Sequence, residues 1–176
     1  MNTFVPYGPD YCASAVCLDT KRLVKQLVEC QQIYDALRTG LPAHILHHPA
    51  TQMWSHHEGA LLCYASAVYA AYRSRFPGRD HKSGEYLRSM CPMFAPVPTW
   101  VEALAPYHRT KLHGKDPVHY AKFAYDAGPD LAHYPVTKNE QLIGWVHKPG
   151  NKWLLDDGTY HNTAWVAIQA ARSKHA

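Results

Sequence analysis

The sequence lacks the motifs that mark most metal sites, nucleotide sites and serine nucleophiles. It holds 13 His and 5 Cys, but no Cys-x-x-Cys pair and no His-Glu-x-x-His motif. No glycine-rich loop follows a predicted strand, so neither a P-loop nor a dinucleotide-binding fold is supported, and no Gly-x-Ser-x-Gly elbow occurs. These absences predict a protein with no metal site and no bound cofactor.

Long apolar runs and paired cysteines are also missing. The most apolar run, Ala60 to Tyr72, is shorter than the roughly 20 residues that span a bilayer, and no basic-then-apolar leader opens the chain. The cysteines are odd in number and lie mostly in apolar helical settings, which is typical of reduced thiols. We expect a soluble cytoplasmic protein without a membrane partner.

What the sequence does contain fits one domain. A chain of 176 residues can bury one good core and is too short to expect two. It shows no repeat, low-complexity tract or convincing linker, so we interpret residues 1–176 as a single domain and expect a monomer. The formal net charge of +4, with 13 His that become cationic below about pH 6.5, favours a polyanionic partner.

The stretch from Asp19 to Gly40 has the clearest helical pattern. Apolar residues recur along one side at three- and four-residue spacing: Leu23, Leu27, Cys30, Tyr34 and Leu37. Asp19 is a suitable N-cap and Gly40 a suitable left-handed terminator, so both helix ends are signalled. We predict that this helix packs against a second one that follows Glu58, with a core formed by Leu23, Leu27, Tyr34, Leu61, Leu62, Tyr64 and Val68.

The opposite side of the same helix carries an unusual set of polar residues. At helical spacing it presents Arg22, Lys25, Gln26, Glu29 and Gln32, so a single carboxylate lies among cations and amides. One interpretation is an ordinary pair between Lys25 and Glu29, worth a few tenths of a kcal/mol. The other is a functional carboxylate, because nearby cations keep it ionised and able to accept a proton or to stabilise positive charge.

The segments around these two helices are expected to be short. Residues 1–9 open as an extended piece packed against the body, and Asp10–Leu18 is predicted as a short helix. Leu41–Trp54 contains two prolines and predicts a loop with one helical turn. Capping boxes at Ser55–Glu58 and Thr99–Glu102 predict the start of the second core helix and of a brief helix that ends near position 105.

The second half of the chain is predicted to be helical as well. Short helices are expected around Gly84–Met90, over Pro117–Ala127 and over Thr163–Lys174. The stretch compatible with β structure is a small hairpin whose turn lies at Pro149–Asn151. The fold class is therefore all-α, mainly helical, with that C-terminal β-hairpin as its one addition.

A basic segment precedes the helix predicted at Pro117. It contains His108, Arg109, Lys111, His113 and Lys115, and Lys122 continues it. Cations at a helix start are not favoured by the helix dipole, so we interpret the segment as a loop that contacts phosphates rather than as a solvated charge run. Lys148 and Lys152, which alternate with tryptophans near the predicted hairpin, are further candidates for such contacts.

Three segments resemble a known family in sequence and in order. They are LDTKRLVKQLVE with CQQI after it, HHPATQMW at 47–54 and HRTKLHGKDPVHY at 108–120. Over roughly the first two-thirds of the chain they are similar to pyrimidine-dimer DNA glycosylases of the endonuclease V type, which occur in phages and some bacteria. The resemblance implies an all-helical domain that kinks double-stranded DNA, flips a base and attacks the sugar C1′ with an N-terminal α-amine, assisted by a helix-borne glutamate.

The resemblance also implies a set of site residues. Glu29 matches the glutamate of the family, and the well-studied members carry a small residue whose amine is freed when Met is removed. Here Asn2 follows Met1, and its bulk predicts that Met1 stays. The catalytic candidates are Glu29, Met1 and Asn2. The DNA-binding candidates are Arg22, Lys25, Gln26, His48, Arg109, Lys111, Lys115, Lys122, Lys148 and Lys152.

Three functions remain open at this point. The first is a glycosylase with lyase action at damaged or modified pyrimidines. The second is a phage-type DNA hypermodification transferase that joins a free amino acid or amine to an activated 5-methyl group of a thymine-like base. There Glu29 would deprotonate the incoming amine, and the absence of a small residue at position 2 favours this function. The third is a non-catalytic DNA-binding module, in which a carboxylate near phosphates would be a liability. All three predict a protein of the bacterial or phage-infected host cytoplasm.

Overall fold

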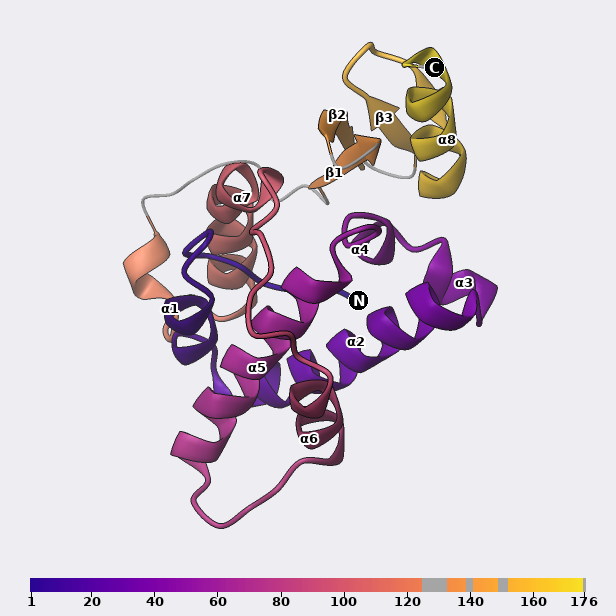
Figure 1. Ribbon diagram of the computed structural model, residues 1–176. Coiled ribbons are helices and arrows are strands. Elements are labelled where there is room, and N and C mark those ends of the chain that lie inside the picture. Colours follow the sequence, from indigo (N-terminus) through magenta and orange to yellow (C-terminus); the bar gives the residue numbers. More distant parts are fainter. Residues whose placement is uncertain (125–132, 139–140, 149–151, 176) are drawn as a thin grey trace.

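The computed structural model describes residues 1–124, 133–138, 141–148 and 152–175. A helical body forms most of the molecule, and a small antiparallel sheet with one helix lies at one end of it (Figure 1). The expected fold class, mainly helical with a small C-terminal hairpin, is confirmed, and the hairpin is part of a four-stranded sheet. No helix in the described part of the chain has the length and apolarity that a membrane crossing requires.

Two long helices form the core of the body. Helix α2 (Thr20–Thr39) begins where Asp19 accepts a hydrogen bond from the backbone of Arg22, and it ends at Gly40, whose φ is 73°. Helix α5 (Glu58–Arg75) packs across it. All of the predicted core residues are buried: Leu23, Leu27, Tyr34, Leu61, Leu62, Tyr64 and Val68. Helix α6 (Lys82–Ser89), close to the predicted bounds, packs on both.

The first residues of the chain run through the interior. Thr3, Phe4 and Val5 are buried, so the predicted extended and packed start is confirmed. Helix α1 (Tyr11–Val16) follows, with Asp10 accepting a hydrogen bond from Ala13 as its predicted N-cap. The next segment holds two short helices, α3 (Ala43–Leu46) and α4 (Pro49–Gln52), where the sequence predicted one helical turn.

Neither predicted capping box forms. Helix α5 begins after His57, so Ser55 is too early to cap it, and Glu58 instead accepts a hydrogen bond from the backbone of His56. Thr99 does precede α7 (Trp100–Lys115), but its side chain makes no capping bond. The Ser/Thr-x-x-Glu pattern therefore located both helix starts to within three residues without forming its bonds.

Helix α7 is longer than predicted, and the basic segment is part of it rather than a loop. Pro106 lies inside the helix and removes one backbone hydrogen bond, to the carbonyl of the exposed Glu102, where water can replace it. The buried positions Leu104, His108 and Leu112 continue at four-residue spacing across the proline. Burial of this face outweighs the proline, so the helix continues past position 105, where it was predicted to end.

The α-helix predicted over Pro117–Ala127 is wrong where the structure describes it. Residues 117–120 form turns, a 3₁₀ helix covers Ala121–Phe123, and residues 125–127 lie outside the described part. Asp116 does cap this segment by accepting from the backbone of His119. The buried side chains Tyr120 and Phe123 are three apart, which matches the three-residue period of a 3₁₀ turn.

The C-terminal unit consists of a sheet and one helix. Strands β1 (His133–Lys138), β2 (Gln141–His147), β3 (Trp153–Leu155) and β4 (Tyr160–His161) pair in this order, all antiparallel. The predicted turn at 149–151 lies outside the described residues. Helix α8 (Ala164–Lys174) lies within the bounds predicted for it, and Thr163 caps it by accepting from the backbone of Val166. The unit contacts the body where Trp165 stacks on His47 at 4.1 Å and Arg172 donates to Gln52.

Candidate functional site

A pocket of about 280 Å³ opens where the polar side of α2 meets the start of the chain and the end of α7. It brings together Met1, Asn2, Phe4, Lys21, Arg22, Lys25, Gln26, Glu29 and Lys115. The predicted arrangement of one carboxylate among cations is therefore present as a concave surface. Lys21 and Lys115 are exposed at this pocket. Sequence reasoning missed Lys21, although its position four residues before Lys25 puts it on the same side of the helix and could have signalled it.

Glu29 is the centre of the pocket. Its side chain is buried, with 5% of the residue exposed. The α-amine of Met1 lies 3.8 Å from Oε1, Lys25 Nζ lies 3.5 Å from the same oxygen, and Gln26 Nε2 donates to Oε2 at 3.1 Å. Lys25 does pair with Glu29, as the simpler interpretation expected. An ordinary helix pair does not explain why the carboxylate of Glu29 also lies beside the α-amine of Met1.

The segment that carries this amine is held by side chains along its length. Gln26 donates to the carbonyl of Asn2 at 2.7 Å and accepts from the backbone of Phe4 at 2.9 Å. Trp54 donates to the hydroxyl of Thr3 at 2.8 Å, and the Tyr64 hydroxyl lies 2.8 Å from the carbonyl of Phe4. A chain end fixed in this way does not fray, and fixed geometry is what a reacting amine needs.

Gln26 links the amine-bearing segment to the carboxylate. It is 1% exposed, and both amide N–H groups are donated, one to Asn2 and one to Glu29. Its carbonyl oxygen lies 2.9 Å from the Phe4 nitrogen and 2.8 Å from the Tyr64 hydroxyl. All of its polar atoms are therefore used inside the protein, which favours a positioning role over the predicted DNA contact.

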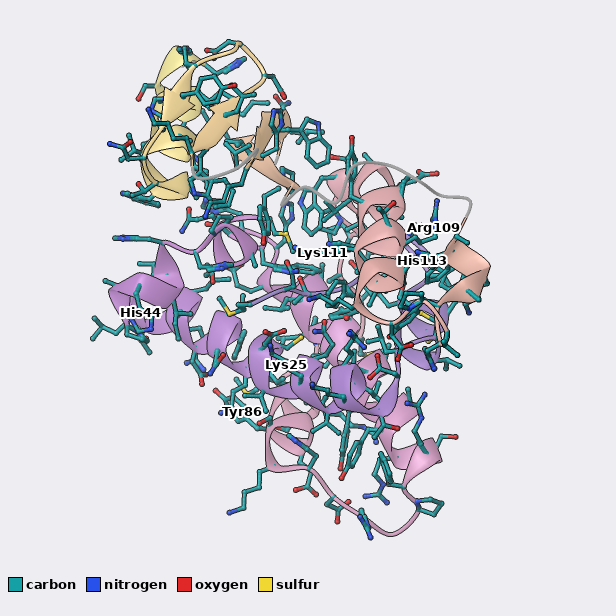
Figure 2. All side chains as sticks on the ribbon, turned by 180° about the vertical axis from the view of Figure 1, so that it is seen from behind. Lys25, His44, Tyr86, Arg109, Lys111 and His113 are labelled. Carbon is teal, nitrogen blue, oxygen red and sulfur yellow. The ribbon has the colours of Figure 1, made fainter. Side chains whose placement is uncertain are left out.

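Helix α7 holds the same segment from the other side. His108 accepts a hydrogen bond from the backbone of Val5 at 2.9 Å, and Arg109 donates to the carbonyl of Pro6 at 2.8 Å. These contacts give His108 and Arg109 a structural role, and the phosphate contact predicted for Arg109 stays a prediction. Figure 2 shows Arg109 and Lys111 on different sides of α7. Of the predicted DNA contacts on this helix, Lys115 lines the pocket.

Two histidines near the start of the chain are kept neutral. Burial lowers the pKa of His108 to about 3, with a further contribution from the charge of Lys111. His48 accepts from the backbone of Ala50 at 3.0 Å. Its burial, followed by the charges of the N-terminal amine and Lys111, lowers the pKa of His48 to about 4. His48 is therefore a neutral neighbour of the amine.

Residues 1–83 match the family model of pyrimidine dimer DNA glycosylase. The match confirms the resemblance seen in the sequence, and it covers just under half of the 176-residue chain. No curated protein and no solved structure matches the chain. The matched region contains Met1, Asn2 and Glu29 together with Arg22, Lys25, Gln26 and His48. The pyrimidine dimer DNA glycosylase match thus indicates an enzyme that acts on DNA.

Part of the site comes from outside the region that matches pyrimidine dimer DNA glycosylase. Tyr134 on β1 is 5% exposed, and its hydroxyl lies 3.0 Å from the side chain of Asn2. Burial, followed by the charge of Glu29, raises the pKa of Tyr134 to about 12. Sequence reasoning missed this residue because nothing in a local pattern signals a contact between positions 132 residues apart.

Arg22 is held at the pocket by two neighbours. It pairs with Asp19 and lies over the ring of Tyr120, 5.6 Å from the ring centre. Tyr120 donates to the same carboxylate at 2.6 Å. Burial raises the pKa of Asp19, but the hydrogen bonds from Tyr120 and Arg22 outweigh this effect and lower the pKa to about 2. These contacts fix the guanidinium of Arg22 at the pocket, and its predicted DNA contact stays a prediction.

The remaining predicted DNA contacts do not line the pocket. Lys122 lies over the rings of Tyr7 and Phe123, each at 5.3 Å, and Lys148 lies over Trp153 at 5.7 Å. Lys152 is exposed beside β3. Their DNA-binding role stays a prediction. Among the described residues, no three His, Cys, Asp or Glu side chains are grouped as a metal site requires.

The two neutral histidines predict acid-sensitive stability. In the unfolded chain each has a pKa near 6.5, and in the folded protein the pKa values are about 4 for His48 and about 3 for His108. As pH falls below 6.5 the unfolded chain takes up protons that the folded protein does not, so stability falls towards pH 3.

Each of the two histidines contributes a slope of up to about 1.4 kcal/mol per pH unit. Urea unfolding at a series of pH values measures the slope of the free energy of unfolding against pH. The variant His108→Asn, which keeps an acceptor and does not titrate, should show a flatter slope. An unchanged slope in that variant would contradict the account.

Proposed function

We propose that this protein is a DNA glycosylase with lyase action on a pyrimidine nucleotide flipped out of double-stranded DNA. The observation that carries the proposal is the α-amine of Met1 held 3.8 Å from the buried carboxylate of Glu29, in a pocket lined by cations. The match to pyrimidine dimer DNA glycosylases supports it. An enzyme that reacts at a nucleotide inside a duplex must first take it out of the stack, at a cost of a few kcal/mol.

The reaction follows from these groups. The amine nitrogen of Met1 bonds to C1′ while the C1′–N bond to the base breaks, and the base leaves with that electron pair and takes up a proton. Glu29 accepts the proton that the amine loses and stabilises positive charge on the sugar. Ring opening gives an imine. Loss of a proton from C2′ then expels the 3′ phosphate, and water hydrolyses the imine and returns the amine.

The geometry favours this chemistry over the two alternatives. A hypermodification transferase would need its incoming amino acid or amine beside Glu29, and the amine of Met1 already occupies that place. A binding module has no use for a carboxylate buried among cations, since the carboxylate repels phosphate. Both alternatives remain measurable outcomes of the test below.

Borohydride trapping tests the proposal, because borohydride reduces an imine to a stable amine. The substrates are duplexes that contain a cyclobutane pyrimidine dimer or an abasic site. We expect a covalent complex of protein and DNA with at least one of them, and none with an undamaged duplex. If neither duplex is trapped, lyase action is contradicted, and mass analysis of nucleosides from treated DNA then distinguishes a transferase from a module without catalysis.

The cations of the pocket predict a salt-dependent affinity for double-stranded DNA. Lys21, Lys25 and Lys115 reach the pocket and are exposed. Each replacement by alanine is expected to flatten the plot of log K against log salt by about one unit, because each phosphate contact releases counterions. Fluorescence anisotropy at several salt concentrations measures the slope.

The matched controls for this titration are Lys82→Ala and Arg88→Ala. Both residues lie exposed on α6 and do not line the pocket. Their slopes should equal that of the unaltered protein. If the slope is unchanged in the variant with all three pocket lysines replaced by alanine, these lysines do not contact phosphates.

A further inference from the structure

The second residue of the chain is held at its side chain as well as at its backbone. The Asn2 carbonyl accepts from Gln26, inside the family match. Its side-chain amide lies 3.0 Å from the hydroxyl of Tyr134. In the amide orientation that satisfies both ends, Asn2 donates to that hydroxyl, and its oxygen accepts from Lys111 Nζ at 2.9 Å. Tyr134 and Lys111 both lie outside residues 1–83.

We propose that Tyr134 and Lys111 are positioning residues, which hold the side chain of Asn2 and thereby fix the direction of the Met1 amine. This inference rests on the proposed function. The amine is separated from Glu29 by 3.8 Å, which is longer than a hydrogen bond, so the carboxylate alone does not orient it. A second restraint one residue away limits the rotations that would swing the amine out of the pocket.

The environment of Tyr134 makes its hydroxyl a rigid anchor. The ring meets His48 edge-on at 6.2 Å and Trp153 at 5.9 Å, and the paired residue on β2, Val146, is buried. A side chain fixed by a sheet holds its partner more accurately than one on a loop. The C-terminal sheet is therefore part of the catalytic apparatus, although it lies outside the matched region.

Lys111 supplies the other end of the restraint. It lies partly buried on α7, on a different side of the helix from Arg109 (Figure 2). Its charge is close enough to both His48 and His108 to add to the lowering of the pKa that burial causes in each. A charged donor makes a stronger hydrogen bond than a neutral one, and this bond fixes which way the Asn2 amide faces.

The test is a double-mutant cycle on the rate of borohydride trapping. Tyr134→Phe removes the hydroxyl and keeps the ring. Asn2→Leu removes the amide while keeping a bulky second residue, so that Met1 stays, which an intact mass verifies. Each single variant is expected to trap about 10-fold more slowly, because a small misplacement of a reacting group is costly. The double variant should be no slower than Asn2→Leu alone, since that substitution already removes the contact with Tyr134.

The control is Tyr86→Phe. It also removes a tyrosine hydroxyl that donates to a side chain, that of Asp35 at 3.2 Å, and neither Tyr86 nor Asp35 lines the pocket. Its trapping rate should equal that of the unaltered protein. The DNA affinity and the melting temperature of Tyr134→Phe should also stay unchanged.

The outcomes separate the inference from the function on which it rests. If the unaltered protein traps no DNA, the proposed function fails. If it traps DNA and Tyr134→Phe traps at the same rate, only the inference is overturned. Losses that add up in the double variant, or a loss that follows a lowered melting temperature, also overturn it, because both indicate a structural role alone.

Discussion

Replacement of Glu29 by glutamine is expected to slow turnover of bound DNA by about 10²- to 10⁴-fold, the range for loss of a general base. Glutamine keeps the shape of the side chain and removes its charge. It can neither accept the proton of the Met1 amine, 3.8 Å away, nor stabilise a cationic sugar. DNA affinity should stay the same or rise, because the carboxylate charge of Glu29 among the pocket cations is lost.

Single-turnover kinetics with saturating protein measures this effect separately from binding. The matched control is Glu85→Gln, on the exposed surface of α6, which should keep the rate. If Glu29 served only as a partner of Lys25, its replacement would cost a few tenths of a kcal/mol of stability and leave the rate intact. Full activity in Glu29→Gln would end its catalytic assignment.

Gln26→Leu is expected to lower both stability and rate. The substitution leaves the buried Phe4 N–H and the Asn2 carbonyl without their partners and frees the carboxylate of Glu29 from one donor. Each unsatisfied buried group costs about 1–3 kcal/mol, so we expect a loss of roughly 2–4 kcal/mol in the free energy of unfolding. Trapping should slow as well, because the amine-bearing segment loses its link to Glu29.

Chemical denaturation and trapping below the unfolding transition measure the two effects. Gln32→Leu is the matched control, since Gln32 is exposed on the same helix, and its stability should change by less than about 0.5 kcal/mol. A stable Gln26→Leu variant with an unaltered rate would show that the four contacts of Gln26 do not hold the site.

Local patterns were sufficient to predict the centre of the molecule. The caps at Asp19 and Gly40 fixed α2, and the three- and four-residue periodicity placed Leu23 and Tyr34 in the core and Glu29 on the polar side. These features depend on neighbours within one helix, so a sequence reveals them. The pocket lies on this helix, and its carboxylate could therefore be predicted as well.

Contacts between distant residues could not be predicted in the same way. The charge of Arg109 pointed to phosphate, and no local pattern signalled that it donates to the carbonyl of Pro6, 103 residues away. His108 likewise bonds to a distant partner, the backbone of Val5. The apolar face of α7 continues past Pro106 because it packs on the body. In α7 tertiary packing outweighed a local signal, and nothing in one sequence reveals which distant partner is present.

The measurement that tests the central claim most directly is to identify which residue carries the DNA after borohydride trapping. The trapped complex is digested with protease and nuclease, and the linked peptide is analysed by mass spectrometry. The account predicts a single modified peptide that begins at Met1, with the sugar remnant on its α-amine. A remnant on the side chain of Lys21, Lys25 or Lys115, which also line the pocket, would contradict it.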